Sequence, residues 1–177
     1  AGSVVFQEAA PVILVNTGQS ALPAAAYQAM QAAQIQQVVI LGGPAAVSPA
    51  LQQAMAQALP TVAIQRYGGA TRNATAAAFD QAYFGPSPGG AVLAANGGGG
   101  GSFVDALAAA PLAGVNGVPI LLTNPTALPA STAGYLTGMA ANQPIWVMGG
   151  SAAIADQVLA GLSSSSSSLA ASNASGG

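Results

Sequence analysis

The chain has 177 residues, of which 52% are hydrophobic and only 3% are charged. Its ionic side chains are two arginines and four acids, and it contains no lysine, histidine or cysteine. This composition excludes intrinsic disorder, a disulfide scaffold, metal sites built on thiolate or imidazole, and nucleic-acid binding, which requires clustered basic residues.

So little charge needs an explanation, because a freely soluble monomer normally keeps charged residues on its surface. One explanation is that an assembly, or a coat of glycan, covers much of the surface. Another is life in acid, where protonated carboxyls would leave only the arginines charged and self-repulsion small. The composition leaves these alternatives open.

An apolar run at residues 106–122 is interrupted by Pro111, Asn116 and Pro119 and is rich in alanine rather than leucine. We therefore expect no membrane-spanning helix. No signal-peptide pattern is visible, and a start at Ala1 would suit a mature, processed secretory protein.

Along the chain, short apolar runs alternate with alanine-rich stretches, as in βαβ units. The first half predicts strands at 12–16, 37–41 and 61–65, and helices at 23–34, 48–58 and 71–84. The second half predicts strands at 91–95, 118–123 and 144–148, and helices at 103–113, 129–140 and 152–162. Strands that are apolar throughout indicate parallel sheets with helices on both faces, a Rossmann-like or flavodoxin-like α/β fold.

The sequence also repeats internally, which is the mark of a tandem architecture. Residues 11–16 recur at 119–124, residues 39–48 recur at 146–155, and the Leu-Pro pair at 22–23 recurs at 128–129. The spacing drifts by one or two residues, as insertions and deletions in loops would produce.

Both arginines and one of the four acids lie in two motifs. The first contains Arg66, Gly69, Arg72, Thr75 and Ala76, and the second is the Phe-x-Asp-Ala-Leu segment at 103–107. Together with the Pro-apolar-Leu-Leu-Thr run at 119–123 and the Gly-Gly pair at 149–150, they resemble the second type of cell wall binding repeat, found in bacterial surface-layer and wall-associated proteins. The sequence departs from that pattern at Thr71, where the family often has Asp, at Asn73, where it has an aromatic residue, and in the glycine-rich turn at 97–101.

This resemblance implies about one and a half tandem repeats: a partial second half at 1–59, a complete repeat at 60–162, and a Ser/Gly-rich tail or linker at 163–177. Family members commonly carry three units. The partial repeat lacks its first strands, so its sheet would have an unpaired edge. We expect a neighbouring subunit to complete it.

The resemblance further implies an extracellular, non-catalytic protein of the cell surface or cell wall. Two functions remain open. The low charge favours a structural protein that self-assembles as a homo-oligomer, filament or surface layer. The alternative is an anchoring module that binds an anionic secondary wall polymer. A nucleotide or sugar-phosphate binding domain is a further alternative, suggested only by the α/β architecture.

Arg66 and Arg72 are the candidate ligands for an anionic polymer, because a guanidinium recognises phosphate and carboxylate groups. They could instead pair with Asp80 or Asp105 and hold the turn at 68–69. Asp105, near the start of a helix, is expected to cap backbone N–H groups and is otherwise a candidate ligand-binding residue.

Three Gly-Gly pairs are expected to permit tight turns after strands. They are Gly42 and Gly43, Gly68 and Gly69, and Gly149 and Gly150. Asn73 and Asn173 stand in sequons for N-glycosylation, and Asn73 or Thr71 is expected to cap a helix.

No arrangement for nucleophilic, acid–base or metal-assisted catalysis is visible, and we expect no enzyme activity, metal or cofactor. The turn at 96–102 resembles a dinucleotide-binding loop. However, the acidic residue that such a site needs about 20 positions later is missing.

Overall fold

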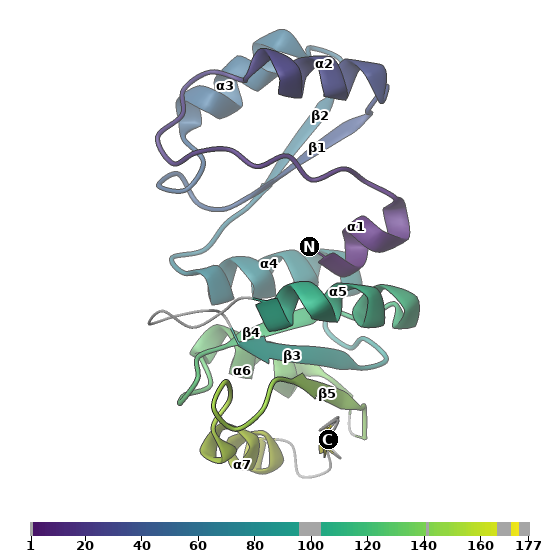
Figure 1. Cartoon of the computed structure of the whole chain (residues 1–177), viewed down its shortest axis with the longest axis vertical. Coiled ribbons are helices and arrows are strands. Elements are labelled where there is room, and N and C mark those ends of the chain that lie inside the picture. The colour runs from purple at the N-terminus through teal and green to yellow at the C-terminus, as the bar shows by residue number, and fades with distance from the viewer. Residues whose placement is uncertain (1, 96–103, 141, 166–170, 174–177) are drawn as a thin grey trace. The chain divides into compact units, whose positions relative to one another are not determined.

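The computed structural model describes residues 2–95, 104–140, 142–165 and 171–173 (Figure 1). Its contacts divide the chain into two compact units. One comprises residues 12–70, here called the small unit, and the other comprises residues 1–11 with 71–177, here called the large unit. Each is described by itself. No helix among the described residues is long and apolar enough to cross a membrane.

The small unit contains two parallel strands and two helices. Its elements are α2 (Ala24–Ala32), β1 (Gln37–Leu41), α3 (Pro49–Ala58) and β2 (Ala63–Tyr67). The strands pair in register from Gln37 opposite Ala63 to Leu41 opposite Tyr67. Its core is a cluster of Ile40, Leu51 and Met55, with partly buried side chains such as Val15 and Ile64 packed against it.

α3 begins where the sequence predicts, because its first turn is capped. Ser48 Oγ accepts a hydrogen bond from Leu51 N at 3.1 Å, and Pro49 occupies the first helical position. A proline there loses no intrahelical hydrogen bond and is already fixed near the helical φ. Ser48 Oγ also donates to Gln19 O at 2.5 Å, which ties the preceding loop to the helix start.

The predicted strand at residues 12–16 is wrong for this structure. The segment has no regular structure, and Val12 and Leu14 are 63% and 89% exposed. An apolar run becomes a strand only when a neighbouring strand satisfies its backbone groups. Within the small unit, β1 pairs only with β2 among the described residues.

The large unit is a four-stranded parallel sheet with helices on both faces. Its elements are α1 (Gly2–Glu8), α4 (Arg72–Phe84), β3 (Ala91–Ala95), α5 (Val104–Asn116), β4 (Ile120–Thr123), α6 (Ala130–Gly138), β5 (Ile145–Met148), α7 (Asp156–Ser165) and β6 (Ala171–Asn173). The strand order is β4-β3-β5-β6, and every pairing is parallel. This arrangement confirms the predicted fold class.

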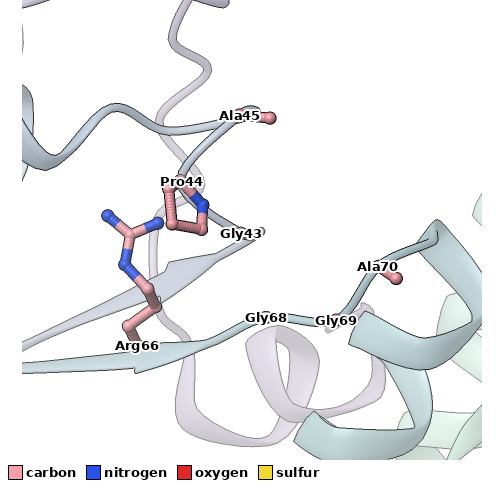
Figure 2. A pocket seen from close by; sticks show the side chains of 7 residues that line it. All are labelled: Gly43, Pro44, Ala45, Arg66, Gly68, Gly69 and Ala70. Atoms are coloured by element: carbon pink, nitrogen blue, oxygen red, sulfur yellow. The ribbon is translucent and has the colours of Figure 1, made fainter.

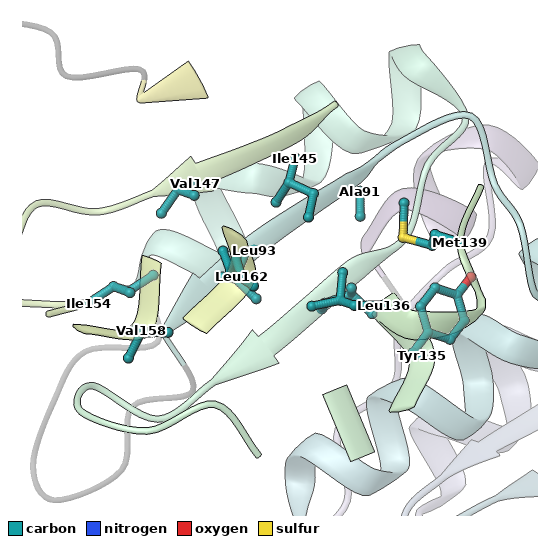
Figure 3. Close-up of a cluster of buried hydrophobic side chains, with 12 residues drawn as sticks. Ala91, Leu93, Tyr135, Leu136, Met139, Ile145, Val147, Ile154, Val158 and Leu162 are labelled. Atoms are coloured by element: carbon teal, nitrogen blue, oxygen red, sulfur yellow. The ribbon is translucent and has the colours of Figure 1, made fainter. Parts of the chain in front are cut away.

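β3 is the centre of the sheet, and all five of its residues are buried. Its odd-numbered side chains pack under α6 and α7 with residues such as Tyr135, Leu136 and Val158 (Figure 3). Its even-numbered side chains, Val92 and Ala94, pack under α5 with Ala109 and Ala113. Because these residues are small, the helices can approach the sheet closely.

The internal repeat is visible in the backbone as well as in the sequence. Residues with positive φ recur in pairs: Ala9 (48°) with Gly117 (64°), Gln34 (47°) with Asn142 (66°), and Gly42 (133°) with Gly149 (114°). The pairing of β1 with β2 recurs as the pairing of β5 with β6, since Gln37 faces Ala63 and Ile145 faces Ala171. β6 is thus the repeat equivalent of β2.

Two elements were not predicted. α1 packs against α5, and β6 lies within the segment that we expected to be an irregular tail. α7 also extends to Ser165, past the predicted end at 162. The repeat boundaries at 59 and 162 remain a prediction. The two compact units are instead divided after residue 70, because β2 pairs with β1 and so belongs to the small unit.

Candidate functional site

Arg66 sits near the end of β2, where two loops of the small unit come together. Its Nε donates to Gln52 Oε1 at 2.8 Å and its Nη1 donates to Gly42 O at 2.7 Å. Its Nη2 is buried and has no hydrogen-bond partner among the described residues. A buried guanidinium nitrogen without a partner is costly, because nothing in the described chain replaces the hydrogen bonds that it made to water.

An open hollow of about 490 Å³ lies beside this side chain (Figure 2). Its lining consists of Arg66 and two loop segments, Gly43, Pro44 and Ala45 after β1, and Gly68, Gly69 and Ala70 after β2. In Figure 2 the guanidinium lies next to Pro44, and the backbone continues from Arg66 through Gly68 and Gly69 to Ala70. The hollow is therefore lined by one cationic side chain and otherwise by glycine, alanine and proline, whose side chains are absent or small.

Glycine is required in these walls for a definite reason. A Cβ on Gly68 would lie 2.9 Å from both the carbonyl carbon and the oxygen of Gly42. Gly42 itself has φ of 133°, a conformation that L residues rarely adopt. The two strand ends can approach, and Arg66 can reach the Gly42 carbonyl, because neither position carries a side chain.

The predicted pairing of the arginines with acids is wrong for Arg66, whose partners are an amide and a carbonyl. Asp80, which we named as a possible partner of the arginines, lies in α4 and is fully buried. Neither of its carboxylate oxygens has a hydrogen-bond partner in the described structure. Burial raises the pKa of Asp80 to about 7. This residue was not recognised from the sequence as unusual, although it stands seven residues after the buried Asn73 and so on the same helix face.

The start of α4 holds Arg72 and Asn73 in different surroundings. Thr71 is the cap and its Oγ1 accepts from Ala74 N at 3.1 Å, whereas Arg72 is exposed. Asn73 is 4% exposed and its Nδ2 donates to Asn124 Oδ1 at 3.1 Å. Thr71, not Asn73, therefore caps this helix, and the buried amide of Asn73 is not an accessible glycan acceptor in the folded chain. Asn173 lies in β6.

Asp105 is in the first turn of α5, at the end where a carboxylate complements the helix dipole. Its Oδ2 lies close to the backbone of Gly149, so that a Cβ on Gly149 would be 2.9 Å from it. Gly150, in contrast, has open space around it. The φ of 114° at Gly149 requires glycine at the first position of this pair, and Gly150 has no such constraint.

The three candidate ligand-binding residues thus fall in two units, Arg66 in the small one, Arg72 and Asp105 in the large one. The glycine-rich turn at 96–102 and Phe103 lie outside the described residues. Among the residues that are described, no three His, Cys, Asp or Glu side chains form a group that could hold a metal ion.

The sequence and the fold of the chain were compared with those of known proteins. Residues 66–159 match the family model described as cell wall binding domain 2. The chain is similar in structure to Cwp6 from Clostridium difficile, with a TM-score of 0.79 and 20% identity over 96% of this chain and 26% of that chain. It is also similar to Cwp8 from Clostridium difficile, with a TM-score of 0.69 and 24% identity over 93% of this chain and 27% of that chain.

At these identities the two solved structures support the fold alone. The chain spans about a quarter of the length of each of them. A search of curated proteins gave no match. The matched segment covers more than half of the 177 residues, and the chain therefore belongs to the cell wall binding domain 2 family.

Proposed function

We propose that this protein is a non-catalytic component of the bacterial cell surface that holds an anionic wall polymer in the hollow beside Arg66. The observation that supports this most directly is the open hollow that Arg66 lines together with the loop segments after β1 and β2. A guanidinium that is fixed by two hydrogen bonds and lines an open hollow is preorganised for a phosphate or carboxylate oxygen.

The low basic content limits what kind of binding this can be. With only two arginines, the chain cannot attract a polyanion by bulk charge, so affinity has to come from one well-placed contact repeated along a polymer or across copies. Arg72, exposed at the start of α4 in the large unit, is the other cation of the chain. Asp105 is itself an anion and could contact only hydroxyl groups of the polymer.

The test is co-sedimentation with purified wall fragments and with the same fragments stripped of anionic polymer. We expect wild type to pellet only with the untreated fragments, and Arg66→Ala to lose most of this binding. Arg72→Ala, the matched removal of the other arginine, should weaken it less, because Arg72 is not part of the hollow. Equal binding by wild type and Arg66→Ala, with both proteins folded by circular dichroism, would contradict the proposal.

Self-assembly into a filament or layer is the second candidate, and a separate observation favours it. Val104, Leu107 and Val115 of α5 are 59%, 64% and 75% exposed. Their spacing, with the exposed Pro111 between them, places all four on one helix face. An apolar stripe on a surface with so few charges is typical of a contact surface.

Sedimentation without wall material, at neutral and acidic pH, tests this second function, with electron microscopy of any pellet. Ordered fibres or sheets are the expected result, and Leu107→Asp should abolish them. Asn116→Asp adds the same charge to the same helix outside the stripe and should leave assembly intact. A wild-type chain that stays a discrete monomer at high concentration would exclude self-assembly and leave polymer binding untouched.

A further inference from the structure

Asp80 is a buried ionisable group that neither polymer binding nor self-assembly uses. It lies in the second half of α4 and is fully buried, and neither of its carboxylate oxygens has a hydrogen-bond partner among the described residues. An ionised carboxylate in such a place would lose its hydration without a compensating bond, which is costly in a protein interior. The packing around Asp80 therefore suits the protonated carboxyl and opposes the ionised one.

The groups around Asp80 give its charge little support. α4 packs against β4, which has no ionisable side chain, and against α6, whose ionisable side chain is Tyr135. Burial raises the pKa of Tyr135, and the charge of Asp80 raises it further, so this phenol stays neutral. On α4 itself, Arg72 is exposed at the far end of the helix, and Tyr83 is uncharged. Burial raises the pKa of Asp80 to about 7, against a smaller opposing effect of the positively charged amino terminus.

Few apolar side chains attach α4 to the large unit. Its three buried residues are Asn73, Phe79 and Asp80, so two of them are polar. Neither apolar cluster of the large unit includes a side chain from α4 among the described residues. The strand that α4 covers, β4, lies at the end of the strand order and not at its centre. Separating part of α4 from its neighbours should therefore cost much less than unfolding the sheet.

Hydrogen bonds attach α4 near its two ends. At its start, Asn73 Nδ2 donates to Asn124 Oδ1 at 3.1 Å. After its end, Tyr135 Oη of α6 donates to the carbonyl oxygen of Gly85 at 2.9 Å. Asp80 lies between these two attachments, and its charge acts on Tyr135, which belongs to the second one. A carboxylate that needs water is thus next to the attachment of α4 to α6.

We propose that α4 is a pH-operated latch of the large unit: when Asp80 loses its proton, the second half of α4 separates from α6 and water reaches the carboxylate. The hydrogen bond from Tyr135 to Gly85 breaks in this step, and the sheet stays folded. The latch is closed in acid and open above neutral pH. It depends on neither polymer binding nor self-assembly, since it uses neither the hollow beside Arg66 nor the exposed face of α5.

Hydrogen exchange of the whole chain at pH 5 and pH 8, corrected for the intrinsic effect of pH on exchange, tests this directly. At pH 5 we expect the amides at 79–84 to be protected at least tenfold. At pH 8 they should exchange almost as fast as in an unfolded chain, while the amides of β3 stay protected by about a hundredfold or more. Protection at 79–84 that persists at pH 8, or that disappears together with the protection of β3, would overturn the proposal.

Two variants test whether Asp80 is the group that operates the latch. Asp80→Asn cannot ionise, and the amides at 79–84 should stay protected at both pH values. Asp156→Asn removes an exposed carboxylate and should behave as wild type. Acetylation of the amino terminus removes the positive charge that opposes the effect of burial, and the opening should remain. Loss of the opening on acetylation, or its persistence in Asp80→Asn, would also overturn the proposal.

Tyr135→Phe tests where the latch opens. It removes the hydrogen bond to Gly85, so the midpoint of opening should move about 0.5–1 pH unit lower. Thr137→Val is the matched control, because the hydroxyl of Thr137 bonds to Gly134 within α6 and its removal should leave the midpoint unchanged. An unchanged midpoint in Tyr135→Phe would show that α4 does not separate from α6 there and would contradict the proposal, whatever the results for wall binding and sedimentation.

Discussion

Gly68 lies against the backbone of Gly42, so closely that a Cβ on Gly68 would sit 2.9 Å from the carbonyl carbon of Gly42. This contact brings together the ends of β1 and β2, and the same Gly42 carbonyl accepts the hydrogen bond from Arg66. The candidate anion site therefore depends on the absence of a side chain at Gly68.

Gly68→Ala should lower the free energy of unfolding by about 1–3 kcal/mol, because the obstacle is backbone that cannot rotate away. Chemical denaturation would measure this. Gly89→Ala is the control, since nothing lies within 4 Å of a Cβ there. If both variants had the stability of wild type, the close approach of the two strand ends would be disproved.

Gly149 and Gly150 provide a matched pair in the large unit. Gly149→Ala would place a side chain 2.9 Å from Asp105 Oδ2 and 3.0 Å from Ala153 Cβ, at φ of 114°. We expect a loss of about 2 kcal/mol or more, since strain and overlap add. Gly150→Ala meets open space and should change stability by less than about 0.5 kcal/mol. Thermal unfolding of the two variants side by side decides this, and equal melting temperatures would contradict it.

Because the carboxyl of Asp80 is buried, we expect the chain to be more stable in acid than at neutral pH. Its pKa rises from 3.8 to about 7 on folding because the carboxyl is buried. The folded chain thus keeps this proton between pH 4 and 7, whereas the unfolded chain releases it. The stabilisation is fully present below pH 4 and is lost as the pH rises toward 7, by on the order of 4 kcal/mol. Denaturation curves across this range would measure the loss.

Asp80→Asn tests the cause of that pH dependence. The amide cannot ionise, so the decline in stability between pH 4 and 7 should largely disappear, and the variant should be more stable than wild type near pH 7. Asp156→Asn removes an exposed carboxylate and should retain the decline. Should Asp80→Asn keep the wild-type profile, another group must be responsible.

Ser48→Ala should destabilise the small unit by about 1 kcal/mol. The substitution removes the cap at Leu51 N and the hydrogen bond to Gln19 O together. Hydrogen exchange in the first turn of α3 is the direct measurement, and Ser48→Thr should restore most of the protection. Protection that is unchanged in Ser48→Ala would show that the cap has no role in stability.

Much of the secondary structure could be predicted because its signals are local. β1 and β3 have the predicted bounds, α3 starts at its Ser-Pro pair, and α4 starts after Thr71. β2 begins two residues later than predicted, at Ala63. The helix α1 was missed because seven residues show little periodicity, and it is defined by packing against α5.

The candidate site could be predicted only in part. Arg66 and the glycines stood out because ions are rare in this chain and because Gly-Gly pairs follow strands. Gln52, which fixes Arg66, could not be found, since it is 14 residues away on a different element and has no distinguishing neighbours. The burial of Asp80 was equally hidden, because a helix face becomes interior only when another element covers it.

The sequence by itself determined the alternation of strands and helices, the internal repeat and the family, because each is written in residue type and spacing along the chain. Tertiary structure alone decided whether an apolar run becomes a strand. Residues 119–124 and 11–16 are nearly the same in pattern, yet the first contains β4 and the second has no regular structure. The difference is β3: a strand needs a neighbour to satisfy its backbone hydrogen bonds, and whether that neighbour is present is not encoded in the strand itself.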